Sequence, residues 1–251
     1  MQHSHEARTV ILIPCYNNLD GLKKTVSKVK HSKPIDILIV DDGSITDEKP
    51  SVKMLTSIKH KNVSIEIISL VKNGGIANAL NEGLRFILKI NQHQFIARVD
   101  CGDTCKPNRF KIQEDFLDNN KEVGLVGSWV KWKKHETNQD VFQFRPPKKH
   151  KNIQRSMALR CSIIHPTVMY RLSVVKNLGL YSTKYQDAED YAYFFDIANN
   201  YETANIPRFL THVEYDEKGI SVQKRREQNK SKIQIIRAYS RTSLYSFAGQ
   251  A

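Results

Sequence analysis

At residues 95–103 the chain reads FIARVDCGD, a short run of β-forming residues that ends in two carboxylates, Asp100 and Asp103. Pro107 follows closely, and its fixed φ suits the first turn of a helix, so an amphipathic helix is expected from there. Open α/β sheets bind ligands at the carboxyl ends of their strands, where carboxylate oxygens suit Mg²⁺ or Mn²⁺. For this stretch alone a solvated turn is an equally good interpretation, because Asp and Gly are ordinary turn residues.

The sequence before this stretch alternates strand-like and helix-like patterns. Apolar strand patterns occur at residues 9–13, 35–40, 63–68 and 95–99, and helical spacings occur between them at 20–30, 48–59 and 76–88. This alternation predicts an α/β fold with a mostly parallel central sheet, helices on both faces and right-handed crossovers. Three of the strands end in PCYN, DDGS and DCGD, so polar side chains collect at one edge of the sheet.

After residue 107 this alternation stops. We expect helices near residues 107–117, 153–159 and 188–199, and strands at 123–130, 167–170 and 209–215. From residue 221 the chain reads as a polar, basic helix with a weak apolar face of Ile233, Ile236 and Tyr239.

The composition is that of an ordinary soluble protein. Hydrophobic residues make up 40% and charged residues 26% of the 251 residues, which suits one α/β domain or two small ones. No apolar run approaches the roughly 18 to 20 residues that span a bilayer, and the polar N-terminus lacks a signal-peptide core, which favours a cytoplasmic location. The cysteines show neither disulfide nor zinc spacing, so free thiols are expected at Cys15, Cys101, Cys105 and Cys161.

The net charge of +13 predicts attraction to polyanions such as nucleic acids, anionic membrane surfaces or phosphorylated substrates. Two basic clusters carry much of this charge, although a solvated face is the usual explanation of any one cluster. The first cluster contains Lys131, Lys133, Lys134, Arg145, Lys148, Lys149 and Lys151. The second contains Lys224, Arg225, Arg226, Lys230, Lys232, Arg237 and Arg241.

The turn after the first strand disfavours one large class of nucleotide-binding enzymes. A dinucleotide-binding fold opens with G-x-G-x-x-G at this point, whereas this chain reads PCYN at residues 14–17. A nicotinamide or flavin enzyme is therefore disfavoured. A nucleotide whose phosphates are neutralised by a metal stays open.

Six motifs in order give the chain a specific resemblance to a known family. They are IPCYN at 13–17, VDDGSITD at 40–47, NGG at 73–75 with ALN at 79–81, RVD at 98–100 with PNRF at 107–110 and Gln113, HPTVMYR at 165–171, and EDY at 189–191. With these motifs the chain resembles glycosyltransferase family 2, inverting nucleotide-sugar transferases of the Rossmann-like GT-A fold, from about residue 8 to residue 221. The resemblance implies a single domain at 1–221, with a nucleotide-donor half at 1–106 and a smaller acceptor half at 107–221. A basic helical tail would follow at 222–251.

The resemblance implies a donor site at the carboxyl edge of the sheet. Pro14, Tyr16 and Asn17 would wall the base and ribose. Asp42 would accept a hydrogen bond from the base, most naturally a uracil, and Asp41 would support the turn. The other residues implied in nucleotide-sugar binding are Asn73, Gly74, Arg98, Asp100 and Lys218. Structural roles stay open for several of them: packing for Tyr16, helix capping for Asp41 and backbone geometry for the glycine pair.

The same resemblance implies that Asp190, beside Glu189, is the catalytic base, which takes the proton from the acceptor hydroxyl as it attacks the anomeric carbon. His165 would contact the donor phosphate or the acceptor. A carboxylate stabilised by the helix dipole and a core histidine are the structural alternatives. A divalent cation, Mn²⁺ or Mg²⁺, held by Asp100 and Asp103 would stabilise the diphosphate leaving group.

Two departures from the family pattern concern the phosphate side of this site. The family's acidic motif usually reads Asp-x-Asp-Asp and its middle Asp commonly holds the metal, but that position is Gly102 here. Either Asp100 or Asp103 would take over the ion, or metal binding is weaker. Where relatives often carry Tyr-Arg-x-His, this chain has YDEK at 215–218, so Lys218 would supply positive charge to the phosphates.

We therefore expect an inverting glycosyltransferase that moves a sugar from a nucleoside diphosphate, most naturally UDP, to a glycan or lipid-linked acceptor. Relatives of this kind commonly build bacterial surface polysaccharide, lipooligosaccharide or capsule. The chain is expected to lie in the cytoplasm and to bind the anionic inner face of the cell membrane peripherally.

Two other functions are weighed against this one. A nucleic-acid-binding module should pair its basic residues with exposed aromatic rings, but the basic clusters contain few beyond Trp129, Trp132 and Phe142, so no nucleic acid is expected. A nucleotidyltransferase using the same acidic site should carry a glycine-rich first loop with a lysine, which is missing.

Overall fold

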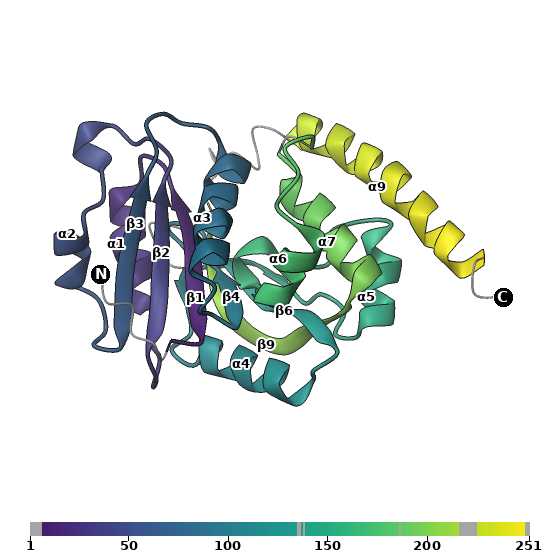
Figure 1. Cartoon of the computed structure of the whole chain (residues 1–251), viewed down its shortest axis with the longest axis horizontal. Coiled ribbons are helices and arrows are strands. Elements are labelled where there is room, and N and C mark those ends of the chain that lie inside the picture. The colour runs from purple at the N-terminus through teal and green to yellow at the C-terminus, as the bar shows by residue number, and fades with distance from the viewer. Residues whose placement is uncertain (1–6, 135–136, 138, 186, 216–224, 249–251) are drawn as a thin grey trace.

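A curled mixed sheet forms the centre of the computed structural model, which describes residues 7–134, 137, 139–185, 187–215 and 225–248 (Figure 1). The described strands follow the order β3-β2-β1-β4-β8-β6-β9-β5, and β7 pairs with β6 outside this path. Their bounds are β1 Thr9–Cys15, β2 Ile35–Asp41, β3 Val63–Ser69, β4 Phe95–Arg98, β5 Thr104–Cys105, β6 Val123–Lys134, β7 Asp140–Phe144, β8 Met169–Arg171 and β9 Glu202–Tyr215.

The first half of the sheet confirms the predicted alternation. Strand β1 pairs in parallel with β2 and β4, and β2 pairs in parallel with β3. Alternate side chains of these buried strands enter two separate cores. Helix α1 (Leu19–Lys28) covers one face through Leu22 and Val26, and α3 (Ile76–Ile90) covers the other through Leu80 and Leu84.

The predicted single helix at residues 48–59 is wrong, because Pro50 interrupts it. Proline lacks the N–H that a helix interior needs, and its ring clashes with the preceding turn. The segment forms a 3₁₀ turn, η1 (Thr46–Glu48), and a short helix, α2 (Val52–Thr56), instead. The Ser51 side chain accepts a hydrogen bond of 3.3 Å from the N–H of Met54 and so caps α2.

The second half of the sheet mixes parallel and antiparallel pairs. Strand β8 runs antiparallel to both β4 and β6, so β6 runs in the same direction as β4. The predicted strands at 123–130 and 209–215 are parts of the longer strands β6 and β9, which pair in parallel with several register shifts. Such irregularities increase strand twist and bend, consistent with the curl of the sheet. The carboxyl ends of β6 and β9 therefore point to the same edge as those of β1, β2 and β4.

The helices of the second half deviate from prediction at their ends. Helix α4 (Arg109–Asn119) begins two residues after Pro107, α5 (His150–Met157) lies earlier than expected, and α7 (Glu189–Asn200) lies within one residue of its predicted bounds. The predicted strand at 167–170 is a 3₁₀ turn, η2 (His165–Thr167), followed by β8, and α6 (Leu172–Leu178) was not predicted.

The basic C-terminal helix is α9 (Arg225–Ala248), and it packs on α7. Within this helix Ile235 is fully buried, and the ring of Tyr239 stacks on that of Phe195 at 5.6 Å between centroids. Ile233 is 51% exposed, so the predicted apolar face was wrong at this residue. Among the described residues, no helix combines the length and the apolar character that crossing a bilayer requires. The predicted phosphate contact of Lys218 lies outside the described residues.

All four cysteines are free thiols, as predicted. The Sγ atoms of Cys15 and Cys101 lie 3.5 Å apart, beside the turns that follow β1 and β4.

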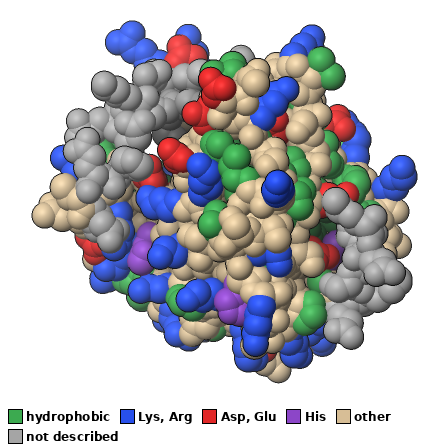
Figure 2. Space-filling model, turned by 90° about the vertical axis from the view of Figure 1, so that its left-hand side faces the viewer, with side chains coloured by type: hydrophobic (Ala, Val, Ile, Leu, Met, Phe, Trp, Pro, Cys, Tyr) green, Lys and Arg blue, Asp and Glu red, His purple; other side chains and the backbone are tan. Residues whose placement is uncertain are grey.

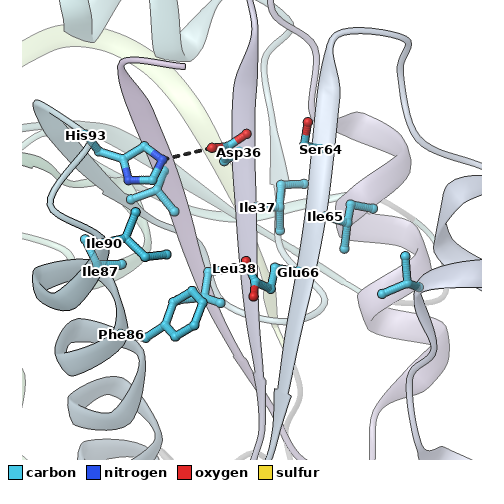
Figure 3. A pocket seen from close by; sticks show the side chains of 12 residues that line it. Asp36, Ile37, Leu38, Ser64, Ile65, Glu66, Phe86, Ile87, Ile90 and His93 are labelled. Carbon is cyan, nitrogen blue, oxygen red and sulfur yellow. Dashed lines mark hydrogen bonds and ion pairs between the residues drawn. The ribbon is translucent and has the colours of Figure 1, made fainter. Parts of the chain in front are cut away.

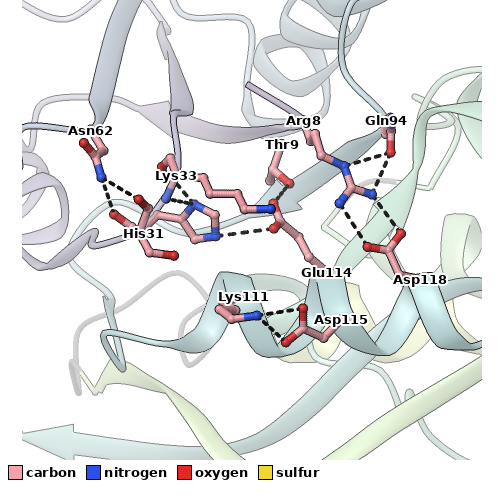
Figure 4. Close-up of polar contacts among 11 residues, drawn as sticks. Arg8, Thr9, His31, Lys33, Asn62, Gln94, Lys111, Glu114, Asp115 and Asp118 are labelled. Atoms are coloured by element: carbon pink, nitrogen blue, oxygen red, sulfur yellow. Dashed lines mark hydrogen bonds and ion pairs between the residues drawn. The ribbon is translucent and has the colours of Figure 1, made fainter. Parts of the chain in front are cut away.

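A buried polar network ties β1 and the loop after α1 to α4 at the amino edge of the sheet (Figure 4). The Glu114 carboxylate accepts a hydrogen bond from Thr9 and lies 3.3 Å from Nε2 of His31. The hydrogen bond with Glu114 raises the pKa of His31. Burial alone would raise the pKa of Glu114, but the hydrogen bonds from His31 and Thr9 lower it.

We predict that Glu114→Gln destabilises the fold by about 1 to 3 kcal/mol, the cost of leaving a buried charged group without its partner. The lowered pKa of Glu114 gives stability that is lost as the pH falls below about 4.3, and the raised pKa of His31 gives stability that is lost as the pH rises above about 6.5. Urea unfolding of both proteins across this range should therefore show the largest deficit between these values. Asp115→Asn, which removes an exposed carboxylate from the same helix, is the matched control, and an equal loss in both variants would contradict the prediction.

Candidate functional site

The turns after β1 and β2 are tied together at the carboxyl edge of the sheet. Asn17 adopts a left-handed conformation (φ 46°), and its N–H donates to Oγ of Ser44 at 2.9 Å. Its side-chain Oδ1 accepts from the N–H of Ile45, also at 2.9 Å. Beside it, Tyr16 is 49% exposed, so its ring has a free face on which a base could stack.

Asp42 shapes the glycine loop that precedes α3. Its Oδ1 and Oδ2 accept hydrogen bonds from the N–H groups of Gly74 and Gly75, at 2.9 and 2.8 Å. Burial raises the pKa of Asp42, and these two hydrogen bonds oppose that shift. Only Gly fits at position 43, where φ is +73° and an added Cβ would lie 2.5 Å from the backbone of Lys72.

This geometry bears on the predicted roles of both aspartates and of the loop. Asp41 is fully buried and accepts a hydrogen bond from the N–H of Ser44 at 3.1 Å, which matches its predicted turn-supporting role. Asp42 is only 3% exposed, so its contact with a base stays a prediction, whereas its hold on the loop is observed. Asn73 and Gly74 are exposed at the rim of the site, and Pro14 is buried within β1.

Asp100 is the accessible carboxylate at the end of β4. Its side chain is 35% exposed and pairs with Nη2 of Arg98, whose own side chain is fully buried. Arg98 also donates to the backbone carbonyl of Val99. Because its side chain is buried, Arg98 would influence the donor through Asp100 rather than by touching the donor directly.

Asp103 is the buried carboxylate of the acidic turn, and it connects this turn to β9. Its Oδ1 accepts from the N–H of Glu214 at 2.9 Å, and its Oδ2 is buried without a hydrogen-bond partner. Burial and the charge of Asp100 raise the pKa of Asp103 well above its usual range. Thr25 supports the same turn, because its Oγ1 accepts from the N–H of Gly102 at 3.0 Å and donates to the carbonyl of Asp103 at 2.8 Å.

The residues of this turn fit a divalent cation in part. Asp100 has the accessible carboxylate oxygens that Mn²⁺ or Mg²⁺ prefers. Asp103 is 3% exposed and would reach an ion only by giving up its bond to Glu214. A Cβ at Gly102 would lie 3.7 Å from Oε2 of Glu214, so the Glu214 carboxylate, which pairs with Lys24, borders the space of the missing aspartate.

Arg109, to which the sequence assigned no role, joins both halves of the sheet beneath this turn. The side chain has no exposed surface, and it donates to the carbonyls of Pro166, Arg98 and Val168 at 2.7, 2.9 and 3.3 Å. By itself, an arginine after an acidic turn is expected at the surface. Only its position in the PNRF motif could have indicated that Arg109 has a buried structural role.

His165 lies in the core beside α7. It is 7% exposed, its Nε2 lies 3.0 Å from the hydroxyl of Tyr181, and its ring contacts that of Phe194 edge-on at 5.4 Å. Burial, helped by the charge of Arg98, lowers the pKa of His165 well below its usual value, so the ring is neutral at pH 7. A neutral ring offers a phosphate no counter-charge.

The first turn of α7 brings two carboxyl groups to the site. Asp190 is partly exposed, and its Oδ1 accepts from the N–H of Tyr191 at 2.7 Å. Burial raises the pKa of Asp190, that hydrogen bond opposes the shift, and the negative charge of Asp100 adds to it. Glu189 is 6% exposed, and burial together with the charge of Asp190 raises its pKa to about 7. Asp100, at the end of β4, is thus one of the charges that act on Asp190 in the first turn of α7.

A basic cleft of about 500 Å³ lies along β6 and β9, near the same edge. Its cationic side chains come from Lys106, Lys131, Lys133 and Arg208, and Phe209 forms an apolar wall. Burial, with the charges of Lys133 and Lys106, lowers the pKa of His212 in this cleft to about 4. The cleft therefore attracts anionic groups without help from histidine.

Comparison with known proteins finds relatives among glycosyltransferases. A relative from Escherichia coli, UDP-Gal:alpha-D-GlcNAc-diphosphoundecaprenol beta-1,3-galactosyltransferase, is 29% identical over 193 residues, which are 72% of this chain and 63% of the relative. The amylovoran biosynthesis glycosyltransferase AmsE of Erwinia amylovora is 29% identical over 206 residues, or 80% of this chain and 73% of that protein. An uncharacterized glycosyltransferase of Haemophilus influenzae is 27% identical over 177 residues. The chain spans 63% of the length of the Haemophilus and Escherichia relatives.

Solved structures share the fold at low sequence identity. Staphylococcus aureus TarS in complex with UDP matches with a TM-score of 0.64 and 17% identity over 92% of this chain and 65% of that one. The mannosyltransferase PcManGT of Pyrobaculum calidifontis, in complex with GDP-Man and Mn²⁺, matches with a TM-score of 0.67 and 13% identity over 99% and 77%. The predicted GT-A fold is thus confirmed. The family model for Glycosyl transferase family 2 matches residues 10–179, more than half of the sequence, and the chain therefore belongs to that family.

Proposed function

We propose that this glycosyltransferase moves a sugar from a UDP-sugar, with inversion at the anomeric carbon, to the hydroxyl of a glycan or lipid-linked saccharide. The observation that carries the proposal is the meeting of three features at one sheet edge. These are the half-exposed Tyr16, the glycine loop held by Asp42, and the carboxylate Asp100, which lies within electrostatic range of Asp190. A single in-line displacement needs a base and a leaving-group site on opposite sides of the sugar, and Asp190 and Asp100 are proposed for these two sides.

Asp190 is the proposed base. It is partly exposed, and its raised pKa makes it a better proton acceptor than an ordinary surface aspartate. Glu189, buried and with a pKa near 7, is proposed to tune Asp190 by its charge rather than to touch the acceptor. His165, neutral and packed against Tyr181, is proposed to position the wall of the acceptor side.

The nucleotide half of the site is proposed to lie within residues 1–106. Tyr16 stacks on the base, Pro14 and Asn17 shape the wall behind it, and Asn73 and Gly74 line the rim. UDP is favoured because the Escherichia coli relative is named for UDP-Gal and TarS was solved with UDP. The GDP-Man bound to PcManGT identifies the alternative donor class to include in a screen.

A divalent cation, when bound, would stabilise the charge that develops on the diphosphate leaving group. Asp100 is the proposed protein ligand, and the phosphates of the donor supply further oxygens. The Arg98 guanidinium holds Asp100 in place beneath this position. Asp103 is proposed to fix the turn through Glu214 and to join the ion only if that bond opens.

The acceptor half is proposed to lie within residues 107–221, and the acceptor to belong to surface polysaccharide synthesis. The names of two relatives, which specify a diphosphoundecaprenol substrate and amylovoran biosynthesis, support this class. A lipid-linked acceptor would bring the chain to the cytoplasmic face of a membrane. Exposed basic residues of α9 and of the basic cleft would contact the anionic lipids there. Lys and Arg side chains are also spread over another face of the molecule, which Figure 2 shows.

The proposed base gives the sharpest test of the reaction. Asp190→Asn keeps the shape and removes the proton acceptor, so turnover of a UDP-sugar with Mn²⁺ should fall by about 10² to 10⁴-fold. Asp100→Asn should instead raise the Mn²⁺ concentration needed for half-maximal activity. Asp196→Asn, farther along the same helix, is the control and should stay near the parent. Near-normal turnover of Asp190→Asn would remove it as the base, and no turnover by the parent with any UDP- or GDP-sugar would overturn the proposed function.

The two hydrogen bonds by which Asp42 holds the glycine loop should control the affinity for the donor. Asp42→Ala frees the N–H groups of Gly74 and Gly75, so the loop loses its fixed position, and UDP binding measured by calorimetry should weaken by about 1 to 3 kcal/mol. Asp42→Asn should lose less, because one oxygen can still accept. Asp47→Ala removes an exposed carboxylate shortly after the same turn and serves as the control. Equal affinity in all four proteins would refute a donor site at this loop.

Membrane attachment is predicted to depend on exposed charge on α9. Deleting the helix would expose Ile235 and its core contacts, so charge removal is the cleaner change. Arg226, Lys230 and Arg237 are exposed, and their joint replacement by Gln should weaken binding to anionic vesicles by roughly 1 kcal/mol per residue. A variant with Gln at the exposed Lys53, Lys61 and Lys89 has the same net charge and should bind like the parent in co-sedimentation. If both variants lose binding equally, net charge rather than α9 is responsible.

A further inference from the structure

A second cavity lies at the opposite edge of the sheet from the proposed donor site. It has a volume of about 260 Å³ and lies between α3 and the amino-terminal parts of β2 and β3 (Figure 3). One wall is apolar, with Phe86 and Ile90 from the last turns of α3. Its polar lining comes from Asp36, Ser64, Glu66 and His93.

Two buried polar atoms at this cavity have no hydrogen-bond partner. Asp36 and His93 are 7% and 6% exposed, and Nε2 of His93 lies 2.9 Å from Oδ2 of Asp36. The remaining Oδ1 of Asp36 and Nδ1 of His93 are buried and unpaired. Figure 3 shows the second oxygen of Asp36 pointing away from His93, toward the side of Ser64. An unpaired buried polar group costs stability, so a ligand that pairs with it gains that free energy.

Both unpaired atoms call for a hydrogen-bond donor. With Nε2 of His93 donating to Asp36, the Nδ1 of a neutral ring can only accept, as can the Asp36 carboxylate. A primary ammonium carries three N–H donors and no acceptor, which matches this lining. The charge is also suitable, because the lining includes the carboxylate of Asp36 and, among the described residues, no Lys or Arg, although the chain as a whole has a net charge of +13.

We propose that this cavity binds a small organic cation with an apolar body, of the primary alkylamine class. The ammonium pairs with Asp36 and the alkyl chain lies along Phe86 and Ile90. The volume, close to the ~300 Å³ of the smallest ligand pockets, suits a chain of about six carbons. Anionic nucleotide sugars are repelled by the Asp36 carboxylate, so this site is independent of the proposed transferase reaction.

The proposal is tested with n-hexylammonium, hexanoate and n-hexanol as probes, using calorimetry and chemical-shift mapping on the full chain. Hexylammonium should bind and shift resonances of Asp36, Ser64 and Ile90, hexanol should bind at least about tenfold more weakly, and hexanoate should not bind. Asp36→Asn should weaken hexylammonium binding at least about tenfold for the same reason. Glu82→Gln, which removes a carboxylate from α3 outside the cavity, should bind like the parent.

A second variant keeps the test sharp if Asp36→Asn fails to fold. Ser64 is exposed, so Ser64→Trp can fill the cavity without disturbing the core, and this variant should keep its melting temperature while losing hexylammonium binding. Binding by a folded Ser64→Trp variant, equal binding of hexanoate and hexylammonium, or no measurable binding of hexylammonium by the parent would each overturn the proposal.

Discussion

Two arginine side chains without exposed surface, Arg98 and Arg109, hold the acidic turn over the centre of the sheet. Burying a cation is costly unless it is fully paired, so these residues dictate where their partners lie. Arg98 pairs with Asp100, and Arg109 donates to the carbonyls of Arg98, Pro166 and Val168. The parallel half of the sheet and the segment leading into β8 are thereby fixed against each other. The acidic turn of the proposed site lies where these two parts meet.

The charge of Arg98 also influences the ionisation of groups on the proposed acceptor side. It lowers the pKa of Asp190 and of Glu189, opposing the larger effect of burial, and it adds to burial in lowering the pKa of His165. One buried cation thus favours ionised carboxylates and a neutral imidazole in the same region. Such opposing shifts within a small volume are typical of functional sites.

The parts of the fold that could be predicted from sequence are those whose signal is local. Strands β1, β2 and β4 are buried on both faces and read as nearly continuous apolar runs, so their presence and parallel direction could be predicted. The full lengths of β6 and β9 could not be predicted, because their carboxyl ends carry lysines and acids that pair across strands rather than enter a core. Likewise, the motifs predicted Asp42 and Asp100 at the carboxyl edge of the sheet, where both residues lie. No local pattern could show that Asp42 accepts hydrogen bonds from the glycine loop. Nor could it show that Asp103 bonds with Glu214, which lies 111 positions farther along the sequence.

Gly102 shows why a departure from a family motif needs its structural surroundings. Its φ of +101° is a conformation that an aspartate side chain adopts only with strain, so the turn here is built for glycine. The hydrogen bond of Thr25 with the N–H of Gly102 and the bond between Asp103 and Glu214 fix that conformation from two sides. The Glu214 carboxylate then borders the space that a longer side chain at 102 would enter. The missing carboxylate of the motif therefore goes together with a backbone conformation that favours glycine, and the carboxylate of Glu214, from the end of β9, borders the same space.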